Sequence, residues 1–355
     1  MSETTTTKPK RPMAKSMVML KAQTAGIYEE AWEAFKKGEP VGWSTAIFPQ
    51  ELCETFGVPV LYPENNAASV SARHLGSELI RHAEGEMRYP INICSYARLN
   101  IAMADKAQHD TLDWEKKEPY MPLPSFLCLA NNSCTQLMKW YENLSRNLDI
   151  PIFFMDCLYN YYEEEPKPHK VKYVRSQLEG NIKKMEKFFN RKFDWDRFME
   201  VQKRSQINVE LFDEIVRMNT HKPAPMNGFD LFSYLSCMVI ARGKESTTEI
   251  LLQLKKEMEE YIKEGKSTFG STPEEFRMHW EGIACWPYLG HNLKTLKKHG
   301  VNCVINGYVT AWSVKYEPGD LDGMAKAYQL ASTNSFSTFS IMDKRVKTIN
   351  DFKCD

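Results

Sequence analysis

The feature that most constrains the fold is an alternation of short apolar runs with longer stretches of helical spacing. The runs 58–62, 126–129 and 150–155 consist mostly of apolar residues such as Val, Ile, Leu and Phe, and turn residues flank them. Parallel strands need long connections that return the chain to the same edge, and helices usually supply them. The sequence therefore predicts an α/β protein with a doubly wound parallel sheet.

The spacing of apolar residues predicts the remaining elements. We expect helices at 17–37, 49–56, 67–83, 171–189, 195–218, 229–242, 247–263, 290–299 and 321–331. A further helix is expected to follow the break at residues 131 and 132 and to end near 147. After the helical middle of the chain, the α/β pattern is expected to return at 282–286 and at the strand 301–305.

Changes in composition divide the chain into parts. Residues 1–16 are polar, lack the apolar segment of a signal peptide and are expected to form a disordered tail. The acidic, proline-bearing run YYEEEPKP at 161–168 predicts a domain junction. The expected architecture is therefore two doubly wound, Rossmann- or flavodoxin-like domains, at 17–165 and 266–355, with a mainly helical segment at 166–265 between them. The second of these domains is expected to be incomplete.

Charge and cysteine content exclude several classes of protein. The 46 basic and 46 acidic residues cancel, so no net field attracts nucleic acid or an anionic membrane surface. The longest apolar stretch, 231–241, is too short to span a bilayer. The nine cysteines are scattered and odd in number, which indicates reduced thiols rather than a disulfide scaffold. We expect a cytoplasmic protein.

Common catalytic motifs are absent from the sequence, so each candidate residue is assessed from its own position. There is no GxGxxG, P-loop, GxSxG, HExxH or CxxC motif. Cys94 lies in NICSYAR, and Cys134 lies in NNSCTQ at the start of a predicted helix. Ligands bind at the carboxyl ends of parallel strands, and a helix N-terminus favours a thiolate. Cys134 is thus a candidate metal ligand, with a packed thiol as the alternative. Glu64, which follows a predicted strand, is a candidate general base, with a solvated cap as the alternative.

Seven segments together carry a resemblance to a known family. In chain order they are PVGWSTAIFPQEL, VLYPENNAA, ICSYAR, NNSCTQLMKWYENLSRNLDIP, PMNGFDLF, EGIACWPYLG and DLDGMAKAY. They resemble the 2-hydroxyacyl-CoA dehydratase and benzoyl-CoA reductase family, from about residue 25 to the end. Among its members they are most similar to the α-type subunit of the (R)-2-hydroxyacyl-CoA dehydratases of anaerobic amino-acid fermentation.

The resemblance implies an oxygen-sensitive lyase that converts a 2-hydroxyacyl-CoA into a 2-enoyl-CoA through a ketyl radical. It implies a [4Fe–4S] cluster, a homologous second subunit in a heterodimer, and an ATP-dependent iron–sulfur activator protein that delivers the electron. Whether a flavin also binds stays open. Two alternatives remain: a benzoyl-CoA-reductase-type subunit, and a non-catalytic partner subunit without a complete cluster site.

The resemblance also assigns roles to individual residues. Cys94 and Cys134 match two of the family's three cluster ligands, and Glu64 matches the acidic residue beside the substrate. The loop formed by Trp43, Ser44, Thr45 and Ala46 matches a loop that lines the same cavity.

Three positions depart from the family pattern. The third ligand of the family lies in an HxNRSCK motif, further along than Asp355, and Cys354 is not its match. The usual CCNNIC is LANNSC here, and Ala46 stands where relatives often carry a hydroxyl residue.

Overall fold

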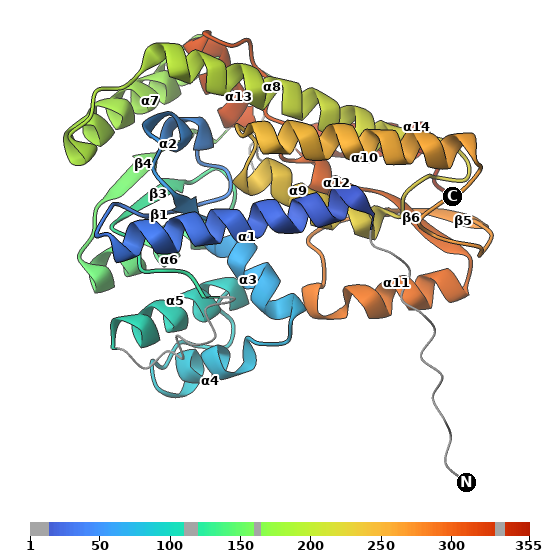
Figure 1. Ribbon diagram of the computed structural model, residues 1–355, viewed down its shortest axis with the longest axis horizontal. Coiled ribbons are helices and arrows are strands. Elements are labelled where there is room, and N and C mark those ends of the chain that lie inside the picture. The colour runs from blue at the N-terminus through green and yellow to red at the C-terminus, as the bar shows by residue number, and fades with distance from the viewer. Residues whose placement is uncertain (1–13, 110–119, 160–164, 331–337) are drawn as a thin grey trace.

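The computed structural model describes residues 14–109, 120–159, 165–330 and 338–355 (Figure 1). Its main sheet has four parallel strands in the order β2-β1-β3-β4. The strands are β1 (Gly42–Ser44), β2 (Val60–Leu61), β3 (Phe126–Ala130) and β4 (Ile152–Met155). Every residue of β3 is buried, as expected for a central strand covered on both faces. The prediction of a mixed α/β fold with a parallel sheet is confirmed.

Helices from the first half of the chain surround this sheet. They are α1 (Lys15–Lys36), α2 (Gln50–Phe56), α3 (Pro63–Ala72), α4 (Ser77–Gly85), α5 (Ser95–Gln108), α6 (Thr135–Leu148) and α7 (Pro168–Phe189). In Figure 1, α1 crosses in front of the sheet, α2 lies above it and α5 lies below it. Of these helices, α5 was not predicted from the sequence.

The prediction of one helix over 67–83 is wrong, because two helices, α3 and α4, occupy this region. His74 has a φ of +58°, a left-handed conformation that ends the helical path after α3. At Gly76 an added Cβ would lie 2.9 Å from Leu99, so the chain passes α5 too closely for a side chain there. The apolar spacing continues across this turn and conceals it in the sequence.

A helical layer follows, formed by α8 (Trp195–Met218), α9 (Gly228–Ile240) and α10 (Glu245–Lys263). Side-chain caps define two of its helix starts: Asp194 accepts a bond from the amide of Arg197 (2.9 Å), and Asn227 accepts one from Phe229 (2.8 Å). Helices α8 and α10 run side by side along the top of Figure 1. The much more apolar α9 lies beneath them and joins the main core.

The last part of the chain contains a two-stranded parallel sheet, β5 (Phe276–Trp280) with β6 (Val301–Asn306). Around it lie η2 (Trp286–Tyr288), α11 (Leu289–Lys298), α12 (Gly307–Thr310), α13 (Leu321–Leu330) and α14 (Thr338–Asp351). The α/β pattern was expected to resume with 282–286, but this segment is not a strand. Gly282 has a φ of +87°, and Pro287 follows in the 3₁₀ turn, so extended pairing is interrupted.

Strand β5 escaped prediction because its sequence contains a buried arginine. The Arg277 guanidinium donates hydrogen bonds to the carbonyl oxygens of Phe352 (2.9 Å) and Asn219 (2.6 Å), and it pairs with Glu274. These partners lie far from Arg277 in the sequence, except Glu274, so a polar residue is accommodated where an apolar one is expected.

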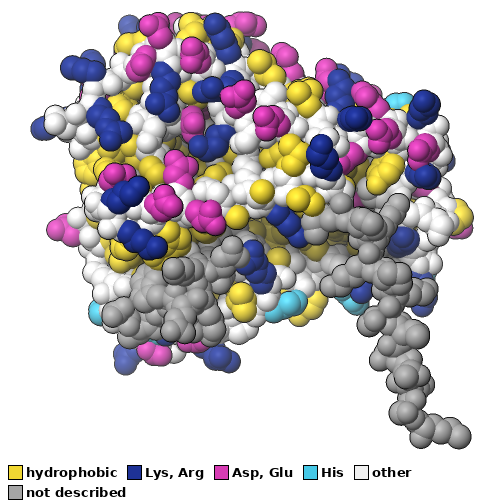
Figure 2. All heavy atoms as spheres, in the orientation of Figure 1, with side chains coloured by type: hydrophobic (Ala, Val, Ile, Leu, Met, Phe, Trp, Pro, Cys, Tyr) yellow, Lys and Arg dark blue, Asp and Glu magenta, His cyan; other side chains and the backbone are white. Residues whose placement is uncertain are grey.

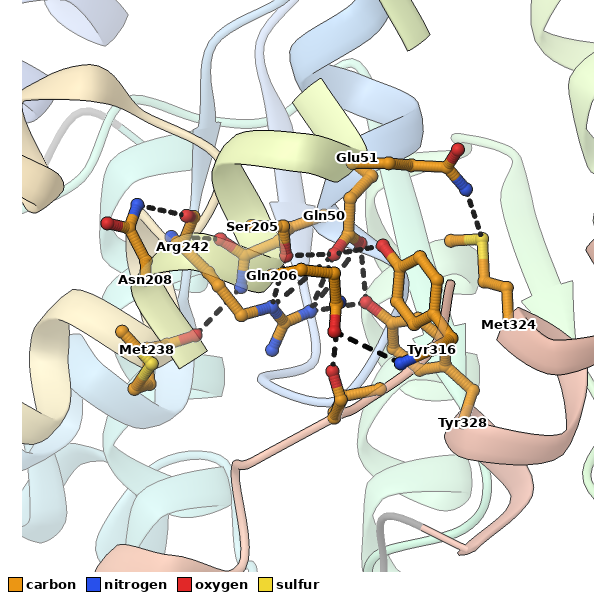
Figure 3. A network of polar contacts seen from close by, with 12 residues as sticks. Gln50, Glu51, Ser205, Gln206, Asn208, Met238, Arg242, Tyr316, Met324 and Tyr328 are labelled. Atoms are coloured by element: carbon orange, nitrogen blue, oxygen red, sulfur yellow. Dashed lines mark hydrogen bonds and ion pairs between the residues drawn. The ribbon is translucent and has the colours of Figure 1, made fainter. Parts of the chain in front are cut away.

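A buried polar network joins α2 to the helical layer and the last part of the chain (Figure 3). The Glu51 carboxylate accepts hydrogen bonds from Ser205 (2.7 Å), Tyr316 (3.0 Å) and Tyr328 (2.5 Å). The Arg242 guanidinium lies 3.2 Å from the same carboxylate and also bonds Tyr328. Both charged side chains are almost fully buried, so each depends on the other for compensation.

The exposed surface is mixed in charge. Acidic and basic side chains are interspersed on the face that Figure 2 shows. Within the described ranges, no helix combines the length and apolar character that crossing a membrane would require.

Candidate active site

The candidate active site is a cavity of about 590 Å³ between helices α1, α3 and α9 and the segments that carry Tyr96, Trp286 and Tyr308. Its lining is apolar over most of α9 and mixed elsewhere. The lining residues are Met17, Leu20, Lys21, Thr24, Ala25, Tyr28, Ala46, Glu64, Asn65, Ala68, Ser69, Ala72, Arg73, Tyr96, Phe232, Ser233, Leu235, Ser236, Val239, Trp286, Leu289 and Tyr308. This size and character are typical of small-molecule and cofactor sites.

Glu64 lies in the cavity wall, in the first turn of α3. Pro63 occupies the first position of this helix, where its missing N–H costs no intrahelical bond. The Oε2 atom of Glu64 accepts a hydrogen bond of 2.6 Å from the amide of Ala46. Burial raises the pKa of Glu64 to about 7, and the Ala46 bond opposes this rise only in part. Near neutral pH the carboxyl group can therefore both accept and release a proton.

The segment 43–46, expected as a loop that lines the cavity, is a loop only in part: Trp43 and Ser44 belong to β1, and Thr45 and Ala46 follow it. Ala46 lines the cavity and binds Glu64. The Trp43 indole N–H donates to the carbonyl of Pro122 (3.0 Å), and the Ser44 hydroxyl donates to the carbonyl of Thr45 (2.9 Å). Thr45 accepts a bond of 3.1 Å from the amide of Ala130. The segment thus meets the cavity at Ala46, while the other three side chains are buried against the sheet and its connections.

Cys94 and Cys134 are the N-cap residues of α5 and α6, and both thiols are free. Cys94 is half-buried and Cys134 is exposed. The backbone N–H of Cys94 donates a hydrogen bond of 2.8 Å to the side-chain oxygen of Gln136, in the first turn of α6. This contact brings the two helix starts together.

Two asparagines hold the loop before Cys134. The Asn131 side chain accepts a bond of 2.7 Å from the amide of Cys157 and also bonds Asp156, beyond the end of β4. The Asn132 side chain donates to the carbonyl oxygen of Tyr328, 2.5 Å away on α13. These asparagines tie the loop to two distant parts of the fold.

The other cysteines lie elsewhere. Five of them, Cys53, Cys128, Cys157, Cys237 and Cys303, are buried, whereas Cys285 is exposed and Cys354 is intermediate. Among the residues that the structure describes, no group of three or more His, Cys, Asp or Glu side chains is placed to hold a metal ion.

Sequence reasoning missed three aromatic residues of the cavity. Tyr96 follows Cys94 by two positions, and its oxygen accepts a hydrogen bond from the indole N–H of Trp286. Burial raises the pKa of Tyr96, and Tyr308, Glu64 and Cys94 all lie within electrostatic range of its hydroxyl. Tyr96 therefore connects the cysteine region with the cavity. Its position in the first turn of a helix capped by a candidate ligand is the signal that could have identified it.

Comparison with known proteins gives a consistent result. A family model described as 2-hydroxyglutaryl-CoA dehydratase, D-component, matches residues 45–355. The chain is 42% identical to the (R)-2-hydroxyisocaproyl-CoA dehydratase alpha subunit of Clostridioides difficile, over 96% of this chain and 81% of the relative. It is 38% identical to the (R)-phenyllactyl-CoA dehydratase alpha subunit of Clostridium sporogenes, over 94% and 79%. It is 32% identical to the (R)-2-hydroxyglutaryl-CoA dehydratase subunit alpha of Acidaminococcus fermentans, over 93% and 82%.

Proposed function

The chain belongs to the 2-hydroxyglutaryl-CoA dehydratase D-component family, and on this basis we propose that it is the α-type subunit of an (R)-2-hydroxyacyl-CoA dehydratase. Such a hydro-lyase removes the hydroxyl group from C2 and a hydrogen from C3, and the products are a 2-enoyl-CoA and water. The single observation that carries the proposal is the family match over residues 45–355. Two features of the structure support the proposal: the cavity that Glu64 lines, and the helix α5 that Cys94 caps.

We propose that Cys94 and Cys134 are ligands of a [4Fe–4S] cluster. Cysteine thiolates are the usual ligands of such clusters, and both thiols cap helices whose starts lie together. The donor set suits the group, although the described residues supply no third side chain that completes it. When bound, the cluster would supply the one-electron chemistry that a non-acidic hydrogen at C3 requires. A flavin has no specific support among these residues.

Glu64 is proposed to move the proton. The Ala46 amide holds Oε2, so the carboxyl group keeps a fixed orientation in the cavity wall while Oε1 is left for substrate. With a pKa of about 7, Glu64 can take the C3 hydrogen as a proton and pass it to the departing hydroxyl. The proton from C3 and the hydroxyl group from C2 together form the one molecule of water that is released.

The lining also favours an apolar acyl side chain. Phe232, Leu235 and Val239 of α9 and Ala68 of α3 form buried parts of the wall, and Glu64 is acidic. The basic lining residues, Lys21 and Arg73, are at exposed positions. An acyl group with its own carboxylate would face Glu64 without a buried cation, which is unfavourable. We expect kcat/KM for (R)-2-hydroxyisocaproyl-CoA to exceed that for (R)-2-hydroxyglutaryl-CoA by about 100-fold or more. Equal values would exclude this preference.

Partners, compartment and architecture complete the proposal. The alpha-subunit names of the relatives support a partner subunit, which we propose is homologous and forms a heterodimer. We propose that an ATP-dependent iron–sulfur activator reduces the complex. Nine free thiols support a reducing, cytoplasmic location. We further propose that the two parallel sheets belong to two doubly wound domains.

The deciding experiment uses oxygen-free protein combined with its partner subunit, activator, ATP and a reductant. A dehydratase forms 2-enoyl-CoA from (R)-2-hydroxyisocaproyl-CoA without net consumption of electrons. A reductase of the benzoyl-CoA type would consume electrons in proportion to product. A non-catalytic subunit would contain no iron. Either of the last two results would overturn the proposal.

A further inference from the structure

We infer that the Tyr96 hydroxyl donates a hydrogen bond to an oxygen atom of the bound acyl-CoA, and that Trp286 fixes it in this role. The inference rests on the proposed function, because the ligand is the proposed substrate. Tyr96 would then be a further catalytic residue beside Glu64.

The direction of the Trp286–Tyr96 hydrogen bond shows that the proton of the Tyr96 hydroxyl is not used in it. An indole N–H can only donate, so the Tyr96 oxygen is the acceptor. A phenol has a single proton, and this bond does not use it. Within the described part of the chain, the structure contains no hydrogen bond from the Tyr96 hydroxyl to a protein acceptor. The proton is thus left for a ligand in the cavity that Tyr96 lines.

The position of Tyr96 places its hydroxyl at the cavity in which the substrate is proposed to bind. Its side chain lies in the first turn of α5, two residues after Cys94, and it lines the same cavity as Glu64. A 2-hydroxyacyl-CoA offers two oxygen acceptors close to its reacting carbons, the 2-hydroxyl and the thioester carbonyl. Because Glu64 and Tyr96 line the same cavity, a ligand whose C3 contacts Glu64 can reach Tyr96 with one of these oxygens.

The packing of Trp286 explains why the hydroxyl keeps one orientation. The Trp286 ring contacts Phe232 of α9 at a centroid distance of 5.6 Å, and Trp286 begins the turn η2, beside α3. Because the Trp286 ring packs against Phe232, its N–H is held toward the Tyr96 oxygen, and this bond orients the Tyr96 hydroxyl before a ligand arrives. Pre-oriented donors lose less freedom on binding than mobile ones.

The test compares the affinity of Tyr96→Phe and wild-type heterodimer for three probes under anaerobic conditions. The first probe is (R)-2-hydroxyisocaproyl-CoA, which carries both oxygens. The second is isocaproyl-CoA, which lacks the 2-hydroxyl, and the third is the thioether analogue of (R)-2-hydroxyisocaproyl-CoA, which keeps the hydroxyl and lacks the carbonyl oxygen. We expect a loss of about tenfold for the probes that carry the contacted oxygen and no loss for the probe that lacks it. Trp286→Phe, which frees the Tyr96 hydroxyl, should lose part of the same affinity. Tyr89→Phe is the matched control, because its hydroxyl bonds Asn143 (3.0 Å) outside the cavity.

The outcomes separate the two proposals. Equal affinity of wild type and Tyr96→Phe for all three probes, in protein with equal iron content, would overturn the role of Tyr96. A uniform loss for all three probes would indicate a merely structural role and would also overturn it. If wild type binds none of the probes, the proposed function itself fails. If Tyr96→Phe does not fold, the selective loss is sought in Trp286→Phe, and its absence there counts against the inference.

Discussion

The backbone N–H of Cys94 and the side-chain oxygen of Gln136 are joined by a hydrogen bond of 2.8 Å. Gln136 lies two residues after Cys134, so this bond couples the positions of two helix-capping cysteines that are far apart in the sequence. The bond joins the starts of α5 and α6, so Gln136 restricts how far the two cysteines can move apart.

Gln136→Ala should weaken the retention of iron without abolishing it. The substitution removes the acceptor for the Cys94 amide, while both thiols remain. We expect the cluster to be lost to a chelator several-fold faster, measured from the decay of its visible absorption in oxygen-free buffer. Gln108→Ala is the matched control, because Gln108 also links α5 to α6, through the carbonyl of Asn147 (3.2 Å), but at the other end of α5. Equal decay rates in the two variants would contradict the proposed coupling.

Cys94→Ala and Cys134→Ala should each abolish most of the bound iron. Each substitution removes one proposed thiolate ligand, so the cluster loses one of the bonds that hold it. Iron and sulfide analysis of anaerobically purified protein measures the effect. Cys285→Ala provides the control, because this thiol is exposed, as Cys134 is, but precedes a 3₁₀ turn and caps no α-helix. Unchanged iron content in both cysteine variants would refute the ligand assignment.

Three strands of the main sheet were predictable because local signals carried them, whereas the three-residue strand β1, which lies between β2 and β3, was not predicted. The runs around β2, β3 and β4 are compact and apolar, and α8 was predicted at its observed bounds. The resemblance drawn from seven short segments is confirmed by the family match. In these regions local sequence and tertiary structure favour the same conformation.

The features that escaped prediction depend on distant partners. Strand β5 contains Arg277, whose burial is compensated by residues such as Phe352 and Asn219. Of the cavity residues, Glu64 and Ala46 stood out through the family resemblance, whereas Tyr96 and Trp286 meet from positions 190 residues apart. No local pattern indicates such a contact.

Glu64→Gln should keep the iron and remove most of the activity. The substitution retains the shape of the side chain and leaves an oxygen that can accept the Ala46 bond, but it cannot carry the proton. In wild type, activity that requires the ionised form should fall as pH decreases through about 7, and this dependence should disappear in the residual activity of the variant. Glu78→Gln, at an exposed position of α4, should behave as wild type. Near-normal turnover in Glu64→Gln would exclude its proposed role.

The same raised pKa predicts an effect on stability. Between the unfolded pKa near 4.5 and the folded pKa of about 7, the folded state binds more protons than the unfolded state. Stability therefore decreases as pH rises through this range, by as much as about 3.5 kcal/mol at 1.4 kcal/mol per unit. Glu64→Gln removes this loss, so its urea midpoint relative to wild type should rise between pH 5 and pH 7.5. A difference that does not change with pH would contradict the raised pKa.

Arg242→Met should destabilise the protein by about 3–5 kcal/mol, because it leaves the Glu51 carboxylate buried without its counter-charge. The double variant Glu51→Gln/Arg242→Met removes both charges and should recover much of this loss, measured by urea unfolding. Burial alone would raise the pKa of Glu51, but Arg242 and the hydroxyls of Tyr328 and Ser205 outweigh it and hold the pKa below its usual value. The contribution of this pair is accordingly present above about pH 4.5 and is lost as pH falls through the lower folded pKa. The double variant should thus lose less stability than wild type on acidification. If it is as unstable as Arg242→Met at neutral pH, the cost of the single substitution lies in packing and not in the unpaired charge.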